Sequence, residues 1–185
     1  DALSTNDPIL IFFFLINLGT IIVMLEFSGG ANAYAATLTK RLQTKTHVEQ
    51  TSLILSFCFF IDDYFNTLTV GTIMRPLTDS FRIPRAKLAF LIDSMAAPLT
   101  VLVPISSWVA VIVGQLTKAN IASVALPSTA IIADPFMVYL ETIPYILYSF
   151  VMIICAFALT YFRWSFGLMR KHEVIAEKTG NVWGG

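Results

Sequence analysis

The chain has 185 residues, of which 56% are hydrophobic and only 13% are charged. A soluble globular domain contains about 25% Asp, Glu, Lys and Arg, and the mean hydropathy of this chain is +0.74. The high hydrophobic content excludes a disordered protein. The 12 basic and 12 acidic residues leave no net charge, which argues against a nucleic-acid binder with a basic face. The composition therefore indicates an integral membrane protein.

The two cysteines, Cys58 and Cys155, lie inside apolar runs, where small buried hydrophobic side chains are expected rather than a disulfide. The chain begins with Asp1 instead of Met, and neither a signal peptide nor a lipid-anchor motif is recognisable. We therefore expect a fragment of a longer protein that forms one membrane unit over residues 1–185.

Four apolar stretches predict the membrane segments, because about 20 residues of helix span a bilayer core of about 30 Å. Pro98 and Pro104 are expected to interrupt the third stretch near residues 97–104. The predicted segments are a helix over 9–38 broken near 28–30, a re-entrant hairpin over 52–76, a broken helix over 88–116, a helix over 136–162 and a cytoplasmic tail over 163–185. The predicted fold is thus an all-α integral membrane protein with three membrane-crossing helices, one of them broken mid-membrane, and a re-entrant helical hairpin.

The hairpin is expected because its apolar part, 52–61, is too short to span. Ten residues of helix rise about 15 Å, half the hydrocarbon thickness, so the chain would turn near 62–67 and return. The alternative is one span over 52–74. The hairpin puts every basic residue except Lys118 on one side, which is typical of short cytoplasmic loops. It also places the N-terminus and loop 117–135 outside.

Carboxylates within the apolar stretches are the candidate functional groups, since a charge in the bilayer costs a few kcal/mol. Glu141 lies about one turn into the last helix and is compatible with a merely interfacial role. Glu26 precedes a break where water can enter. Asp62 and Asp63 stand at the expected hairpin tip, together with an amide and a hydroxyl. The candidate cation and proton site comprises Asp62, Asp63, Asn66, Thr67, Asp93, Ser94, Ser106 and Ser107.

These groups are hard oxygen donors, which suit Na⁺ better than soft metals, and the three aspartates Asp62, Asp63 and Asp93 are the expected Na⁺ ligands. A broken helix also leaves free carbonyls and amides at the midplane, where secondary transporters bind ions. Two structural interpretations stay open. Asp62 and Asp63 would simply cap a buried turn, and Pro98 and Pro104 would kink a helix that carries structural serines.

The residues around these candidates resemble the Na⁺/H⁺ antiporters of the NhaC family. The resemblance covers about residues 19 to 148 and combines several ordered motifs. They are SGG at 28–30, IDDYFN at 61–66, VG at 70–71, MRPLTD at 74–79, RAKLA at 85–89, DS at 93–94, AAP at 96–98, VPISSW at 103–108 and IPY at 143–145 with Tyr148.

The resemblance implies a secondary antiporter of a bacterial-type inner membrane, not an enzyme, that exchanges Na⁺ for H⁺ by alternating access. Its expected partners are the lipid bilayer and the missing remainder of the parent transporter, with a homodimer left open, and no cofactor is expected besides the transported Na⁺ and H⁺. Relatives in the family exchange organic acids such as malate and lactate, which is the first alternative. A passive channel and an intramembrane aspartyl protease are two more, although the chain lacks the protease's Gly-x-Gly-Asp motif.

Overall fold

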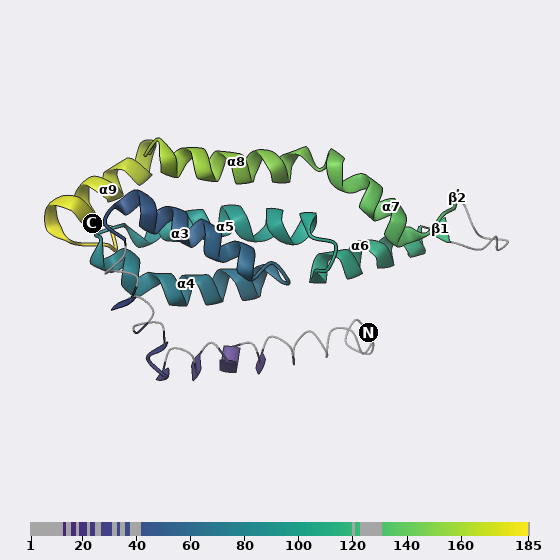
Figure 1. Cartoon of the computed structure of the whole chain (residues 1–185), viewed down its shortest axis with the longest axis horizontal. Coiled ribbons are helices and arrows are strands. Elements are labelled where there is room, and N and C mark those ends of the chain that lie inside the picture. Colours follow the sequence, from purple (N-terminus) through teal and green to yellow (C-terminus); the bar gives the residue numbers. More distant parts are fainter. Residues whose placement is uncertain are drawn as a thin grey trace.

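The computed structural model describes residues 42–119, 121–122 and 131–184, together with positions 13, 16–17, 19–21, 23–24, 27–30, 33 and 36–37 (Figure 1). Within this part the regular secondary structure is helical apart from one pair of two-residue strands, which confirms the all-α class. The helices are α3 (Lys45–Cys58), α4 (Asp63–Ser80), α5 (Arg85–Leu102), α6 (Ser107–Lys118), α7 (Pro135–Thr142), the 3₁₀ turn η1 (Ile143–Tyr145), α8 (Leu147–Tyr161) and α9 (Gly167–Thr179). The strands β1 (Ile121–Ala122) and β2 (Ile131–Ile132) pair in parallel.

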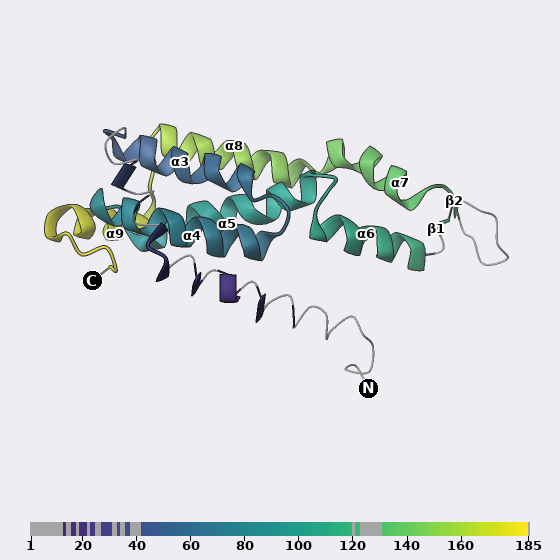
Figure 2. The same cartoon turned by 60° about the horizontal axis from the view of Figure 1, so that its bottom comes forward.

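Four of the helices, α3, α4, α5 and α8, lie side by side along the long axis of the molecule (Figures 1 and 2). Helix α5 is central, because it contacts each of the other three. One core cluster joins α3, α4 and α5 around Val48, Met74 and Ile92. A second joins α3, α5 and α8 around Leu53 and Met95. Helices α6 and α7 extend beyond this bundle at one end, and α9 lies at the other.

Helices α3 and α4 form an antiparallel hairpin. Its turn lies at residues 59–62, earlier than the predicted 62–67, because Asp62 caps α4 and the helix begins at the next residue. Both open ends of the hairpin reach the same residue of α9. Lys45 Nζ lies 2.8 Å from Glu177 Oε1, and Arg82 donates a hydrogen bond to the Glu177 carbonyl at 3.2 Å. The chain therefore does not run straight through residues 52–74.

The break in the third stretch lies at residues 103–106, where α5 and α6 meet at 49°. Pro104 explains its position, because a residue before proline is driven out of the helical region, and Val103 is accordingly extended. The expectation that Pro98 also interrupts the helix is wrong. Pro98 lies inside α5, buried among neighbouring helices, which keep the helix intact although one backbone hydrogen bond is lost.

The prediction of one plain helix over 136–162 is also wrong in the structure. The segment divides into α7, η1 and α8, and its two parts meet at 46°. Pro144 accounts for the division, since it has no N–H to continue the helical hydrogen-bond ladder. The Tyr139 hydroxyl donates to the Val101 carbonyl and thereby fastens α7 to the end of α5.

Two helices end in the same type of left-handed turn. At the end of α8, the N–H of Trp164 bonds the Leu159 carbonyl and Arg163 has a φ of 54°. At the end of α4, the N–H of Ile83 bonds the Thr78 carbonyl and Arg82 has a φ of 55°. Both are Schellman motifs, in which glycine usually takes the left-handed position. An arginine in this position has a strained backbone, because its Cβ atom disfavours a positive φ.

Three further predictions bear on the fold. In the segment 9–38, the described residues Ser28 and Gly29 form a turn at the predicted break, and Gly29 has a φ of 72°. Cys58 and Cys155 are free, as expected, but exposed rather than buried. In the described part no individual helix has both the length and the apolarity to cross a bilayer, whereas α5 with α6, and α7–η1 with α8, meet those criteria as bent pairs.

Candidate functional site

Asp62 is the centre of the candidate site, at the turn between α3 and α4. Its Oδ1 accepts a hydrogen bond from the Phe65 N–H at 2.9 Å and caps α4. Its Oδ2 accepts one from the Ser107 hydroxyl at 2.8 Å, at the first residue of α6. The residue is only 8% exposed. Two helix N-termini therefore converge on one buried carboxylate.

The broken segment holds the hairpin tip in place through its backbone. The Ser107 N–H donates to the Ile61 carbonyl at 2.9 Å. The neighbouring Ser106 has a different task, because its hydroxyl donates to the Thr100 carbonyl and accepts from the Val109 N–H as the cap of α6. Of the two serines predicted for the site, Ser107 contacts an aspartate and Ser106 shapes the break.

Asn66 lies one turn after Asp62 and is fully buried. Its amide nitrogen donates to the Ser56 carbonyl at 2.7 Å, which ties α4 to the end of α3. Its Oδ1 and the hydroxyl of Thr69 are buried without a hydrogen-bond partner in the described part of the chain. Unpaired buried oxygens are costly, and they are groups that a dehydrated cation or a water molecule would satisfy.

The remaining predicted residues lie elsewhere. Asp63 is half-buried in the first turn of α4. Thr67 and the exposed Asp93 line an open groove of about 650 Å³ between α4 and α5. Ser94 is buried, and its hydroxyl donates to the Leu91 carbonyl of its own helix. The predicted grouping of Asp93 and Ser94 with the hairpin tip is therefore corrected.

The predicted Na⁺ ligand set is corrected in the same way. Within the described residues no three His, Cys, Asp or Glu side chains form a group that could hold a metal ion, so Asp62, Asp63 and Asp93 do not share one. The reason is the rotation of α5 about its axis, which places Asp93 on the side of the helix that lines the groove. Glu141 is exposed near the end of α7, and Glu26 lies outside the described residues.

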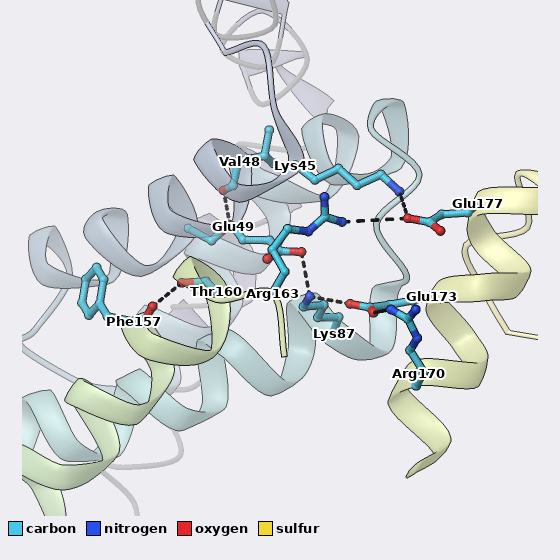
Figure 3. Close-up of polar contacts among 11 residues, drawn as sticks. Lys45, Val48, Glu49, Lys87, Phe157, Thr160, Arg163, Arg170, Glu173 and Glu177 are labelled. Carbon is cyan, nitrogen blue, oxygen red and sulfur yellow. Dashed lines mark hydrogen bonds and ion pairs between the residues drawn. The ribbon is translucent and has the colours of Figure 1, made fainter. Parts of the chain in front are cut away.

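A second polar cluster, at the opposite end of the bundle, was not predicted (Figure 3). The Lys87 ammonium of α5 lies 2.9 Å from Glu49 of α3 and also pairs with Glu173 of α9. Lys87 and Glu49 are almost completely buried. Removing either charge would leave another without compensation in a site of low polarity. The cluster therefore binds α9 firmly to the bundle.

The pKa values of this cluster depend on burial and on the neighbouring cations. Burial raises the pKa of Glu49, against the opposing attraction of Lys87. The hydrogen bond from Lys45 lowers the pKa of the more exposed Glu177, whose carboxylate also lies 3.9 Å from Arg163. The signal in the sequence was helical spacing, since Glu173 and Glu177 are four residues apart and share one face of α9.

Comparison with known proteins gives one informative match. The chain is 36% identical to an uncharacterized protein of Haemophilus influenzae over 176 residues, which cover 94% of this chain and 32% of that protein. The chain thus spans about a third of the length of the curated relative that it matches. No protein-family model matches the sequence. No solved structure matches it either.

Proposed function

We propose that the chain is part of a secondary antiporter that exchanges Na⁺ for H⁺ across a membrane, as the resemblance to the NhaC family implies. One observation carries the proposal: a buried carboxylate, Asp62, lies where two helix N-termini meet at a broken helix. Discontinuous helices of this kind form the ion sites of secondary transporters.

The proposed chemistry is competition between Na⁺ and H⁺ for one carboxylate site. When ionised, Asp62 supplies the charge that a largely dehydrated Na⁺ requires, and Asp63 lies next to it. The Asn66 Oδ1 and the Ser107 hydroxyl add neutral oxygens of the type that hard cations prefer. When a proton binds the carboxylate, the attraction for Na⁺ is lost and the cation leaves.

The surface of the bundle supports a position in the membrane. The outer side of α8 exposes large apolar side chains along most of its length, among them Leu147, Val151 and Ile154. Exposed apolar faces of this extent occur where a protein meets lipid or another protein. In this proposal the bent pairs α5–α6 and α7–α8 cross the bilayer, together with segment 9–38, and the α3–α4 hairpin enters it from the cytoplasmic side.

An exchange assay tests the proposal. The full-length transporter is reconstituted into proteoliposomes that contain a pH-sensitive dye, and a Na⁺ pulse is compared with a choline pulse. We expect Na⁺, but not choline, to move protons, and we expect an imposed pH gradient to concentrate ²²Na⁺ against its own gradient. Proton movement without uphill Na⁺ accumulation would instead identify a channel.

One observation favours a second candidate, Na⁺- and H⁺-coupled exchange of an organic acid. The groove between α4 and α5 has the volume of a small-molecule site, and Arg75 and Arg85 line it together with Asp93. Arg85 is held by Asp79 at 2.7 Å. In the same proteoliposomes, lactate or malate would then have to be present for Na⁺ to move protons.

A further inference from the structure

The junction between α8 and α9 presents a group of exposed aromatic side chains. Tyr161, Phe162, Trp164 and Phe166 are between 56% and 71% exposed. Neighbouring rings contact one another, with Phe162 and Trp164 stacked at 5.1 Å. Rings with an apolar body and a polar edge concentrate at the interface between the bilayer core and the headgroups. The junction therefore has the composition of a membrane interface.

Beneath these rings lies a cavity of about 200 Å³. Its walls are mainly apolar and come from α5, α8, α9 and the junction itself: Phe90, Leu91, Leu159, Trp164, Phe166 and Met169, with Lys87 and Ser165 as the polar members. The Ser165 hydroxyl is buried and has no hydrogen-bond partner in the described residues. The cavity thus suits an apolar chain that carries a hydrogen-bonding group at one point.

Two exposed basic residues, Arg170 and Lys171, stand near the start of α9 and follow directly on the cavity residue Met169 in the sequence. The acidic residues of α9 are engaged elsewhere, Glu173 with Lys87 and Glu177 with Lys45. Arg170 lies 3.8 Å from Glu173, which shares Lys87 with Glu49, and the Arg170 side chain is largely exposed. Basic residues next to a membrane helix attract anionic headgroups.

We propose that the α8–α9 junction binds an anionic phospholipid. Part of an acyl chain fills the cavity between Leu159, Trp164 and Phe166, and an ester oxygen accepts a hydrogen bond from Ser165. The phosphate lies against Arg170 and Lys171. The proposal rests on the membrane position proposed above, but not on Na⁺/H⁺ exchange.

Photolabelling tests this proposal in membrane vesicles that contain the full-length transporter. Phosphatidylglycerol and phosphatidylcholine with the same diazirine-bearing acyl chain are compared, and labelled peptides are mapped by mass spectrometry. We expect phosphatidylglycerol to label residues 159–171 several-fold more strongly than phosphatidylcholine, and both lipids to label the outer face of α8 at Val151 and Ile154 equally. Inorganic phosphate, at matched ionic strength, should not displace the label.

Charge variants sharpen the test. The double substitution Arg170→Gln with Lys171→Gln should reduce phosphatidylglycerol labelling of the junction several-fold, to the level of phosphatidylcholine labelling. Lys178→Gln removes a basic residue from the far end of the same helix and should leave the labelling unchanged.

Three results would overturn the proposal. Equal labelling by both lipids would remove the anionic specificity, and displacement by phosphate would identify a free anion as the ligand. An unlabelled junction beside a labelled α8 would show that protein, not lipid, covers the junction. If α8 is unlabelled too, the membrane position fails together with this site, whereas exchange activity is measured separately.

Discussion

At the scale of single residues, Asp62 performs two functions with its two carboxylate oxygens. One oxygen caps α4 and the other accepts the Ser107 hydroxyl. The structural interpretation of Asp62 as a helix cap and the functional one as an ion ligand are therefore compatible. The two neighbouring serines also have separate structural tasks. Ser106 stabilises the break through the Thr100 carbonyl, and Ser107 contacts Asp62.

Alanine substitutions separate the two serines. Ser106→Ala removes the cap of α6 and should lower the free energy of unfolding by about 1 kcal/mol. Ser107→Ala should also lower stability, because the buried Asp62 Oδ2 loses its hydrogen-bond donor. Unlike Ser106→Ala, it should weaken Na⁺ affinity by removing an oxygen next to Asp62. Denaturant unfolding in detergent and the Na⁺ dependence of exchange measure the two effects. Equal loss of Na⁺ affinity in both variants would argue against this division.

Glu49 gives a prediction about pH. Its pKa in the folded protein is raised above the ordinary value of 4.5 by burial, so between these two values the folded state binds more protons than the unfolded state. Stability must then fall as the pH rises from 4.5 through the raised pKa. The lowered pKa of Glu177 acts in the opposite sense, but it is common to any pair of variants that differ only at residue 49.

The comparison is therefore between the wild type and Glu49→Gln, which cannot ionise. The melting temperature of the wild type, relative to the variant, should decrease as the pH is raised above 4.5. Thermal unfolding in detergent over a pH series gives the difference directly. Parallel curves for the two proteins would mean that Glu49 titrates alike in the folded and unfolded states.

At the scale of secondary-structure elements, helix ends determine the arrangement of the bundle. The breaks at 103–106 and 143–146 follow from prolines, and left-handed turns lead from α4 into α5 and from α8 into α9. Both turns place an arginine close to Glu177 near the end of α9. Cations at the C-terminal end of a helix interact favourably with its dipole, which offsets part of the backbone strain.

Glycine and alanine at position 163 test this strain. Both substitutions remove the guanidinium group, and they differ only in the Cβ atom that a φ of 54° disfavours. Arg163→Gly should therefore be more stable than Arg163→Ala by about 1 kcal/mol. The same pair of substitutions at Arg82 should give a similar difference. Equal unfolding free energies for the glycine and alanine variants would show that the turn is not strained.

At the scale of the whole molecule, the ionic cluster around Lys87 and the proposed cation site lie at opposite ends of the bundle. The cluster of Lys87 and its glutamates fixes α9 at one end, and Asp62 meets the broken helix toward the other. Hairpin α3–α4 connects the two regions, since Glu49 lies near the start of α3 and Asp62 caps the start of α4. In the proposed orientation the ionic cluster faces the cytoplasm.

Cysteine labelling tests this orientation. Cys58 and Cys155 are first replaced by alanine, because both are exposed. Single cysteines at Gln43, Ser80 and Lys178 should react with an impermeant reagent only from the cytoplasm, and one at Lys118 only from outside. Labelling of position 80 from outside would contradict the re-entrant hairpin. Ser128 belongs to the same expected outer loop, 117–135, but lies outside the described residues, so Lys118 serves as the outer position.

Some of the structure followed from simple sequence signals. The count of basic residues favoured a hairpin, and Pro104 marked the break to within two residues of its observed position. Other features could not be predicted because they depend on tertiary contacts. The uniformly apolar composition of residues 136–162 gave no sign that the helix divides at Pro144. Hydropathy also does not reveal that Lys87 pairs with Glu49 on another helix. Nor does it show that Asp93 faces the groove, because a helix can rotate about its axis.

The most direct test of the central claim is Na⁺-driven proton movement by the full-length protein that carries Asp62→Asn. Asparagine retains the N-cap of α4 through its single carbonyl oxygen, and its amide nitrogen can donate to the Ser107 hydroxyl instead of accepting from it. The exchangeable charge is thus lost with little change in shape. Asp134→Asn is the matched control, because Asp134 caps α7 through the Phe136 N–H at 2.8 Å and is exposed. We expect exchange to be abolished by Asp62→Asn and retained by Asp134→Asn. Exchange near the wild-type rate by Asp62→Asn would contradict the proposed site.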